Sequence, residues 1–156
     1  MDFEDLDWER RYSRWPAYGR SKLANLLFSF ELARRARSAN SRLSSLAAHP
    51  GYSGTNLQSS GPGMGVPLLG PLVKVVASAS NAVLAQSDRQ GALPALYAAT
   101  SPDAENGDYI GPSGPGEWRG SPDQVGSSSR ANDIPDAERL WAVSEERTGV
   151  RFGPLA

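Results

Sequence analysis

The chain has 156 residues, a formal net charge of −1, one histidine and no cysteine. This length suits one ordinary domain, and the near-neutral charge gives no electrostatic case for nucleic acid or an anionic membrane as a partner. The composition excludes disulfides, cysteine-ligated metal clusters and histidine-rich metal sites. With no run of roughly 18 apolar residues and no secretory signal, a cytoplasmic protein is predicted.

The first predicted element is a long helix over residues 18–37, where apolar residues recur at helical spacing. Pro16 suits its first turn, because the missing N–H costs nothing there. Phe28 and Leu32 widen the apolar surface beyond a single stripe. We therefore expect a helix that is buried on more than one side or that packs against a partner subunit.

The elements that follow are shorter and alternate in type. They are a strand over residues 43–48 that stops at His49-Pro50-Gly51, a loop at 59–71, a helix at 72–84, a helix at 91–100, a strand at 108–112, a mobile loop at 114–132 and a helix at 136–148 capped by Gly149. This order favours an α/β layered fold. Two strands cannot close a parallel-sheet core, because such a sheet needs several strands and cover on both faces. A missing part or a partner is therefore indicated.

The chemistry is carried by Tyr18 and Lys22, because residues four apart lie on one face of a helix. A nearby cation stabilises phenolate and lowers a tyrosine pKa from about 10. Such a tyrosine can exchange a proton with an alcohol or carbonyl near neutral pH, while the hydride must come from a cofactor. Chance gives this spacing in roughly 6% of shuffled chains. From spacing alone, a packed tyrosine and a solvated lysine remain the favoured alternative.

Three segments in order resemble the short-chain dehydrogenase/reductase family. Residues 18–28 (YGRSKLANLLF) match its Y-x-x-x-K motif and active-site helix, residues 49–55 (HPGYSGT) resemble its Pro-Gly segment, and residues 108–112 (DYIGP) resemble its last sheet strand. Residues 3–8 (FEDLDW) are similar to the retinol-dehydrogenase-like and WW-domain-oxidoreductase-like branch. The resemblance covers most of residues 1–112 and, more loosely, the final helix.

The resemblance implies an α/β fold that is the C-terminal portion of a Rossmann-type doubly wound parallel sheet, with the N-terminal dinucleotide-binding half missing. One partial domain, residues 1–156, would hold the active-site helix and Pro-Gly segment (1–55), a substrate lid (56–90), and a C-terminal helix, strand, loop and helix (91–156). The glycine-rich residues 61–65 follow no strand and lack the Gly-x-Gly-x-x-Gly spacing, so they are rejected as a phosphate loop. The family's Asn-Ala-Gly strand end and catalytic serine are not found.

The same resemblance implies residue roles. Tyr18 would be the acid/base, and Lys22 would favour its phenolate form and bind the nicotinamide ribose. The remaining cofactor contacts would come from backbone groups near Pro50, Gly51 and Ser53 and from the Thr55 hydroxyl, which would hold the carboxamide and the diphosphate side. The cofactor would be NAD or NADP, with no residue here to choose between them. His49 is expected to pack or to hydrogen-bond rather than to catalyse.

These expectations lead to two hypotheses. The first is an NAD(P)-dependent oxidoreductase that interconverts an alcohol and a carbonyl on a small, apolar substrate and that is truncated and inactive alone. It would pair with a complementing N-terminal half, or form a homodimer through helix 18–37. The second is a non-catalytic remnant or interaction protein that uses the apolar helix as a binding surface.

Overall fold

The computed structural model describes residues 1–51 and 87–153 of the chain. They form two compact units: unit 1 consists of Met1–Ala47, Glu105–Asp108 and Gly126–Ala156, and unit 2 of Ala48–Ala104 and Tyr109–Val125. The elements in chain order are α1 (Arg14–Ser38), β1 (Ala47–Ala48), α4 (Asp88–Gly91), α5 (Leu93–Thr100), β2 (Tyr109–Pro112), η3 (Pro115–Glu117), β3 (Pro122–Gln124), η4 (Ser129–Asn132) and α6 (Ile134–Thr148). The predicted helix 72–84 and nearly all of the predicted lid fall outside the described residues.

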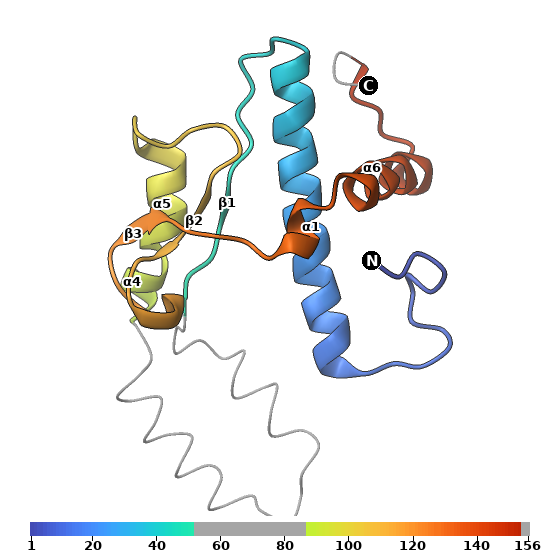
Figure 1. The fold of residues 1–156 in the computed structure, drawn as a ribbon, viewed down its shortest axis with the longest axis horizontal. Coiled ribbons are helices and arrows are strands. Elements are labelled where there is room, and N and C mark those ends of the chain that lie inside the picture. The colour runs from blue at the N-terminus through green and yellow to red at the C-terminus, as the bar shows by residue number, and fades with distance from the viewer. Residues whose placement is uncertain (52–86, 154–156) are drawn as a thin grey trace, which may run out of the picture. The chain divides into compact units, whose positions relative to one another are not determined.

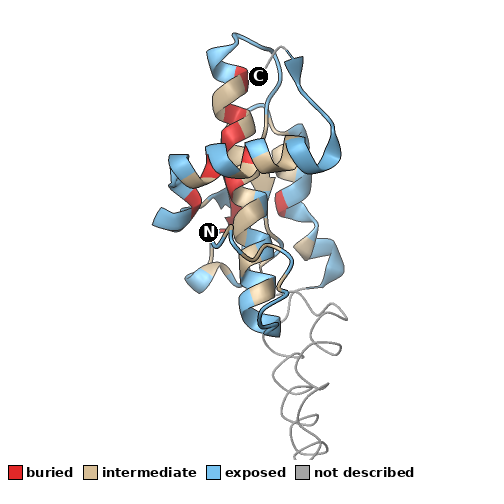
Figure 2. Ribbon diagram, turned by 90° about the vertical axis from the view of Figure 1, so that its right-hand side faces the viewer, coloured by how far each residue is buried: buried red, intermediate tan, exposed pale blue. Residues whose placement is uncertain are grey.

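Unit 1 is built on α1, which confirms the predicted helix and begins one turn earlier. Pro16 lies in its first turn, and Arg35 and Arg37 lie in its last turn, where cations interact favourably with the helix dipole. Its fully buried apolar side chains are small apart from Leu27. Figure 2 shows these buried residues along the C-terminal half of the helix.

The final helix of unit 1, α6, lies across α1 (Figures 1 and 2). The carboxylate of Asp133 accepts the Asp136 amide at its N-terminus, and Gly149 ends it in the left-handed conformation with φ 70°, as the sequence predicted. Trp141 is 2% exposed and stacks on Phe28 with ring centroids 5.1 Å apart. Phe28 thus packs against α6.

One charged side chain, Glu31, is buried in unit 1 at 2% exposure. Arg34 donates two hydrogen bonds to its carboxylate at 2.8 Å, and Arg35 donates a third at 2.6 Å. Burial by itself raises the pKa of a carboxyl, but these hydrogen bonds and charges outweigh it and lower the pKa of Glu31 below 4.5. Arg34 and Arg35, near the C-terminal end of α1, thus stabilise a buried charge.

This lowered pKa predicts an acid-dependent loss of stability. A carboxylate whose folded-state pKa lies below its unfolded value stabilises the fold above pH 4.5, and this stabilisation is lost as the pH falls through the folded value. Glu31→Gln should cost about 1.5–3 kcal/mol of unfolding free energy at pH 7 and should show a flatter fall at acidic pH. Urea denaturation at several pH values measures both. Glu4→Gln, at an exposed pair with Arg139, is the control and should change little.

Unit 2 is a small sheet with helix α5 packed on β2 and β3 (Figure 1). The sheet order is β1-β2-β3, and β2 and β3 are antiparallel, with Gly111 opposite Asp123. The His49 amide donates to the Ile110 carbonyl at 2.9 Å, and in unit 1 the Ala47 amide donates to the Asp108 carbonyl at 2.9 Å. From the first bond to the second, the bonded residues advance by two positions towards the C-terminus on both strands. Strands β1 and β2 therefore run parallel, and the sheet is mixed.

Two sequence-based predictions need correction here. The strand predicted over residues 43–48 is a strand only at Ala47–Ala48. Residues 114–132, predicted as a mobile loop, contain β3 and two 3₁₀ helices. The turn that brings β3 back to β2 is closed by the Gly114 amide, which donates to the Arg119 carbonyl at 3.0 Å. Three strands are therefore described instead of two, because pairing with β2 orders a segment that has little apolar character of its own.

Candidate functional site

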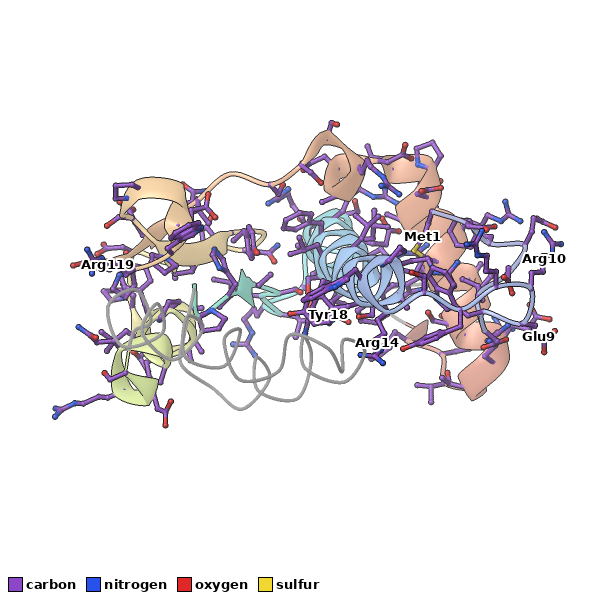
Figure 3. The ribbon with its side chains drawn as sticks, turned by 90° about the horizontal axis from the view of Figure 1, so that it is seen from below. Met1, Glu9, Arg10, Arg14, Tyr18 and Arg119 are labelled. Carbon is purple, nitrogen blue, oxygen red and sulfur yellow. The ribbon has the colours of Figure 1, made fainter. Side chains whose placement is uncertain are left out.

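The predicted catalytic pair lies on one side of α1, near its N-terminal end (Figure 3 labels Tyr18). The Lys22 ammonium nitrogen lies 5.4 Å from the centroid of the Tyr18 ring. Tyr18 is 43% exposed, and Trp15 contacts its ring edge-on at 6.5 Å. Among the described residues, neither the Tyr18 hydroxyl nor the Lys22 ammonium has a hydrogen-bond partner. Within residues 1–51 and 87–153 the structure thus brings the two side chains together and leaves both partly exposed.

The N-terminal segment that leads into α1 is held by charged contacts within unit 1. Arg20 donates to the carbonyls of Asp5 and Leu6 at 2.6 and 3.0 Å, and its guanidinium lies 4.0 Å from the Trp8 ring centroid. Arg147 of α6 forms two 2.9 Å hydrogen bonds with Asp7, and this pairing lowers the pKa of Asp7. Because this segment is anchored, the N-terminal end of α1 that carries Tyr18 has defined surroundings.

A wide hollow of about 650 Å³ in unit 1 also borders α1, but it is not the predicted site. It is lined by the N-terminal segment and by Pro16, Gly19 and Leu23 of the helix, among others. Residues two apart on a helix point in directions about 200° apart, so Tyr18 faces away from the side that carries Pro16 and Arg20. Lys22, which carries the ammonium group of the predicted pair, does not line the hollow either.

The C-terminal half of α1 is tied to the chain before β1 and β2 by Asn106. The Asn106 side chain accepts the Ser45 amide at 2.9 Å and donates to the Ala33 carbonyl at 3.0 Å. Arg37 donates to the Asn106 carbonyl at 2.8 Å. Sequence reasoning missed this residue, although Asn106-Gly107 is a strong turn signal. Asn106 thus holds the chain at Ser45, just before β1, the strand that leads to the Pro-Gly segment.

In unit 2, the predicted Pro-Gly segment directly follows β1. Gly51 has φ +69°, a left-handed conformation that favours glycine. A Cβ atom at Gly51 would lie 2.6 Å from the Trp118 carbonyl oxygen and 2.8 Å from that of Glu117. No other residue type fits there without moving the backbone of the segment after β2. The glycine of the Pro-Gly segment is therefore required by its packing.

Titratable side chains from β2 and η3 lie beside His49 at the start of this segment. The His49 ring lies 5.1 Å from the Tyr109 ring, and its Nε2 lies 3.0 Å from a Glu117 carboxylate oxygen. Burial, and then the negative charge of Glu117, raise the pKa of Tyr109 above 10. Tyr109 therefore stays neutral at physiological pH. Sequence reasoning missed Glu117, because only the fold brings it to His49.

The predicted site residues thus fall into three groups. Tyr18 and Lys22 lie together in unit 1, Pro50 and Gly51 lie in unit 2, and Ser53 and Thr55 lie outside the described residues. The roles predicted for all six stay predictions. In the described part of the chain, no helix combines the length and the apolar character needed to cross a bilayer.

Comparison with known proteins gives a consistent result. No family model matches the chain. Over 151 residues it is 37% identical to retinol dehydrogenase 14 of Mus musculus, covering 96% of this chain and 40% of that protein. It is 35% identical to human retinol dehydrogenase 12, with 97% and 42% covered. A short-chain dehydrogenase/reductase of Emericella nidulans is 32% identical, with 94% and 42% covered. The chain therefore spans about two fifths of the length of these relatives.

A solved structure agrees with these relatives. An uncharacterised protein from Mycobacterium paratuberculosis superposes with a TM-score of 0.68 at 41% identity, over 96% of this chain and 45% of that one. The predicted α/β fold is confirmed by this match, which covers less than half of the solved chain. The chain belongs to the short-chain dehydrogenase/reductase family of oxidoreductases, of which it represents the C-terminal part.

Proposed function

We propose that the chain carries the acid/base and nicotinamide-binding part of an NAD(P)-dependent oxidoreductase that interconverts an alcohol and a carbonyl. The observation that carries this proposal is the pair on α1: the Lys22 ammonium nitrogen lies 5.4 Å from the Tyr18 ring centroid, and both side chains are exposed and without hydrogen-bond partners among the described residues. Catalysis would need the remaining three fifths of the family domain, in the same polypeptide or as a second chain.

The donor set of this pair fits a nicotinamide nucleotide. An ammonium group has three donors, which suit the ribose hydroxyl oxygens, and a phenol can both donate and accept. Lys22 would hold the ribose through these donors. Tyr18 would then pass a proton to or from the substrate oxygen. The bound cofactor supplies the hydride, which no side chain can provide.

The substrate class is proposed from the relatives. Several of them are named for retinol, an alcohol on a long apolar chain. We propose an apolar alcohol or aldehyde for this chain as well. The segment predicted to cover such a substrate, residues 56–90, is almost entirely outside the described residues.

Binding of NADH and NADPH to Lys22 variants tests the proposal. The protein to use is the chain completed with the N-terminal part of a relative, followed by fluorescence titration. Lys22→Ala should weaken nucleotide binding about tenfold or more, because hydrogen bonds from a charged group contribute about 1.5–3 kcal/mol. Arg10→Ala removes an equal charge at the hollow and should leave affinity unchanged. Equal affinities for Lys22→Ala and the parent protein would contradict the proposal.

The alternative is a non-catalytic remnant or interaction protein. It is favoured by the partly exposed apolar residues of α1, whose Leu23 and Leu26 are only half-buried. The DNA upstream separates the two readings. A frame there that encodes a glycine-rich turn and an Asn-Ala-Gly strand end supports the enzyme. Unrelated sequence, together with no nucleotide binding by the folded chain, supports the remnant.

A further inference from the structure

The single histidine of the chain is bonded to the Pro-Gly segment through one ring nitrogen, and its other ring nitrogen lies beside a carboxylate. His49 Nδ1 accepts a hydrogen bond from the Gly51 amide at 3.2 Å. An amide N–H can only donate, so Nδ1 must carry no proton in this arrangement. The neutral ring therefore has its proton on Nε2. Which nitrogen is protonated is set by this hydrogen bond, as in other histidines with a fixed partner.

The Nε2 side of the ring lies beside the partly exposed carboxylate of Glu117. Nε2 is buried and lies 3.0 Å from Glu117 Oε2, an ion-pair distance whose direction falls short of a hydrogen bond. Tyr109 on β2 faces the same ring and stays neutral because of its raised pKa. A carboxylate next to Nε2 favours the protonated nitrogen on this side. The contacts of both ring nitrogens therefore favour the same neutral tautomer of His49, with the proton on Nε2.

The His49 ring can occupy this position only because residue 111 in β2 is a glycine, which has no Cβ atom. A Cβ atom at Gly111 would lie 2.1 Å from His49 Nε2, which no packing tolerates. Glu117 itself has a positive φ of 57°, a conformation that is uncommon for a residue other than glycine. Strained positions of this kind persist where the surrounding structure fixes them and cluster at functional sites.

The bond from a side chain to the amide two residues on is the pattern of an Asx turn, with imidazole in place of an Asn or Asp side chain. We propose that His49 is a positioning residue that uses this bond to hold the Pro50-Gly51 turn in the conformation required to meet the nicotinamide. The consequence for the cofactor rests on the proposed function, whereas the conformation of the turn does not. Protonation of Nδ1 removes the acceptor and frees the Gly51 amide.

Nitrogen NMR on the full chain tests the geometry directly, because one histidine gives one set of ring signals. At neutral pH the spectrum should show a protonated Nε2 and an unprotonated Nδ1. As the pH falls, the Gly51 amide signal should move with the same midpoint as the ring. A protonated Nδ1 at neutral pH overturns the inference. So does a Gly51 amide signal that does not move when the ring signals move with pH.

Two substitutions in the completed enzyme test the consequence for the cofactor. His49→Asn keeps an acceptor that reaches the Gly51 amide, whereas His49→Gln places its amide one bond further out, on the Nε2 side. His49→Gln should raise the KM for NADH or NADPH about three- to tenfold, because a hydrogen bond contributes about 0.5–1.5 kcal/mol. It should leave kcat nearly unchanged, and His49→Asn should restore the parent KM.

The outcomes separate this inference from the proposed function. A cofactor KM in His49→Gln equal to that of the parent enzyme overturns the inference, as does a His49→Asn variant that folds and behaves like His49→Gln. If His49→Gln does not fold, the nitrogen NMR spectrum of the parent chain still tests which ring nitrogen of His49 is protonated. A parent protein with the expected tautomer but with no nucleotide binding contradicts the proposed function and leaves the turn assignment intact.

Discussion

Replacement of Tyr18 by phenylalanine should lower kcat by about a hundredfold to ten-thousandfold in the completed enzyme, the range that a positioned general acid or base contributes. The substitution removes only the hydroxyl, which has no hydrogen-bond partner among the described residues. The ring still packs edge-on against Trp15 and beneath Lys22. Stability should therefore be unchanged, and the loss should appear in steady-state turnover with the cofactor at saturation.

The matched control is Tyr12→Phe, a second exposed tyrosine of unit 1 that is 67% exposed and packs edge-on against Trp8. This variant should keep full turnover, since it changes an equivalent hydroxyl away from the predicted pair. Thermal unfolding of both variants checks that the fold is intact. Undiminished turnover in Tyr18→Phe would remove this tyrosine from the mechanism.

Replacement of Trp141 by alanine should destabilise unit 1 by about 3–5 kcal/mol, the range for truncation of a buried large aromatic side chain. Trp141 is 2% exposed, and it packs between Phe28, which is stacked at 5.1 Å, and Phe152, whose ring lies 5.6 Å away. The Arg35 guanidinium also lies 4.6 Å from its ring centroid. Because typical domains are stable by only about 5–15 kcal/mol, this one change should shift the urea midpoint far downward.

Trp15→Ala is the control for size and residue type, since Trp15 is 67% exposed on α1. A substitution at such a surface position usually changes stability by no more than about 0.5 kcal/mol. Urea denaturation of the full chain, followed by circular dichroism, measures both variants. Similar midpoints for the two would contradict the packing of α6 on α1 through Trp141.

Local patterns in the sequence determined the helices and the chemical pair. The apolar period of α1 and the glycine that ends α6 act within a few residues of chain, so spacing and capping rules read them directly. The proximity of Tyr18 and Lys22 follows from the helix alone, because residues four apart must meet on one face. The chain's resemblance to an oxidoreductase family was confirmed by the relatives, whereas the roles of Tyr18 and Lys22 stay predictions.

Tertiary structure alone decided the features that depend on residues far apart in the chain. No local pattern places Asn106 against the carbonyl of Ala33, or Glu117 beside His49, because these contacts span about 70 residues each. Strand β3 forms by pairing with β2, and the polar sequence of β3 does not predict this pairing. Burial of Glu31 likewise depends on how α1 is covered within unit 1, and its charge is compatible with burial because Arg34 and Arg35 bind it. The sequence could therefore supply the reactive groups, whereas the fold supplied the contacts that hold the Pro-Gly turn and the helix in place.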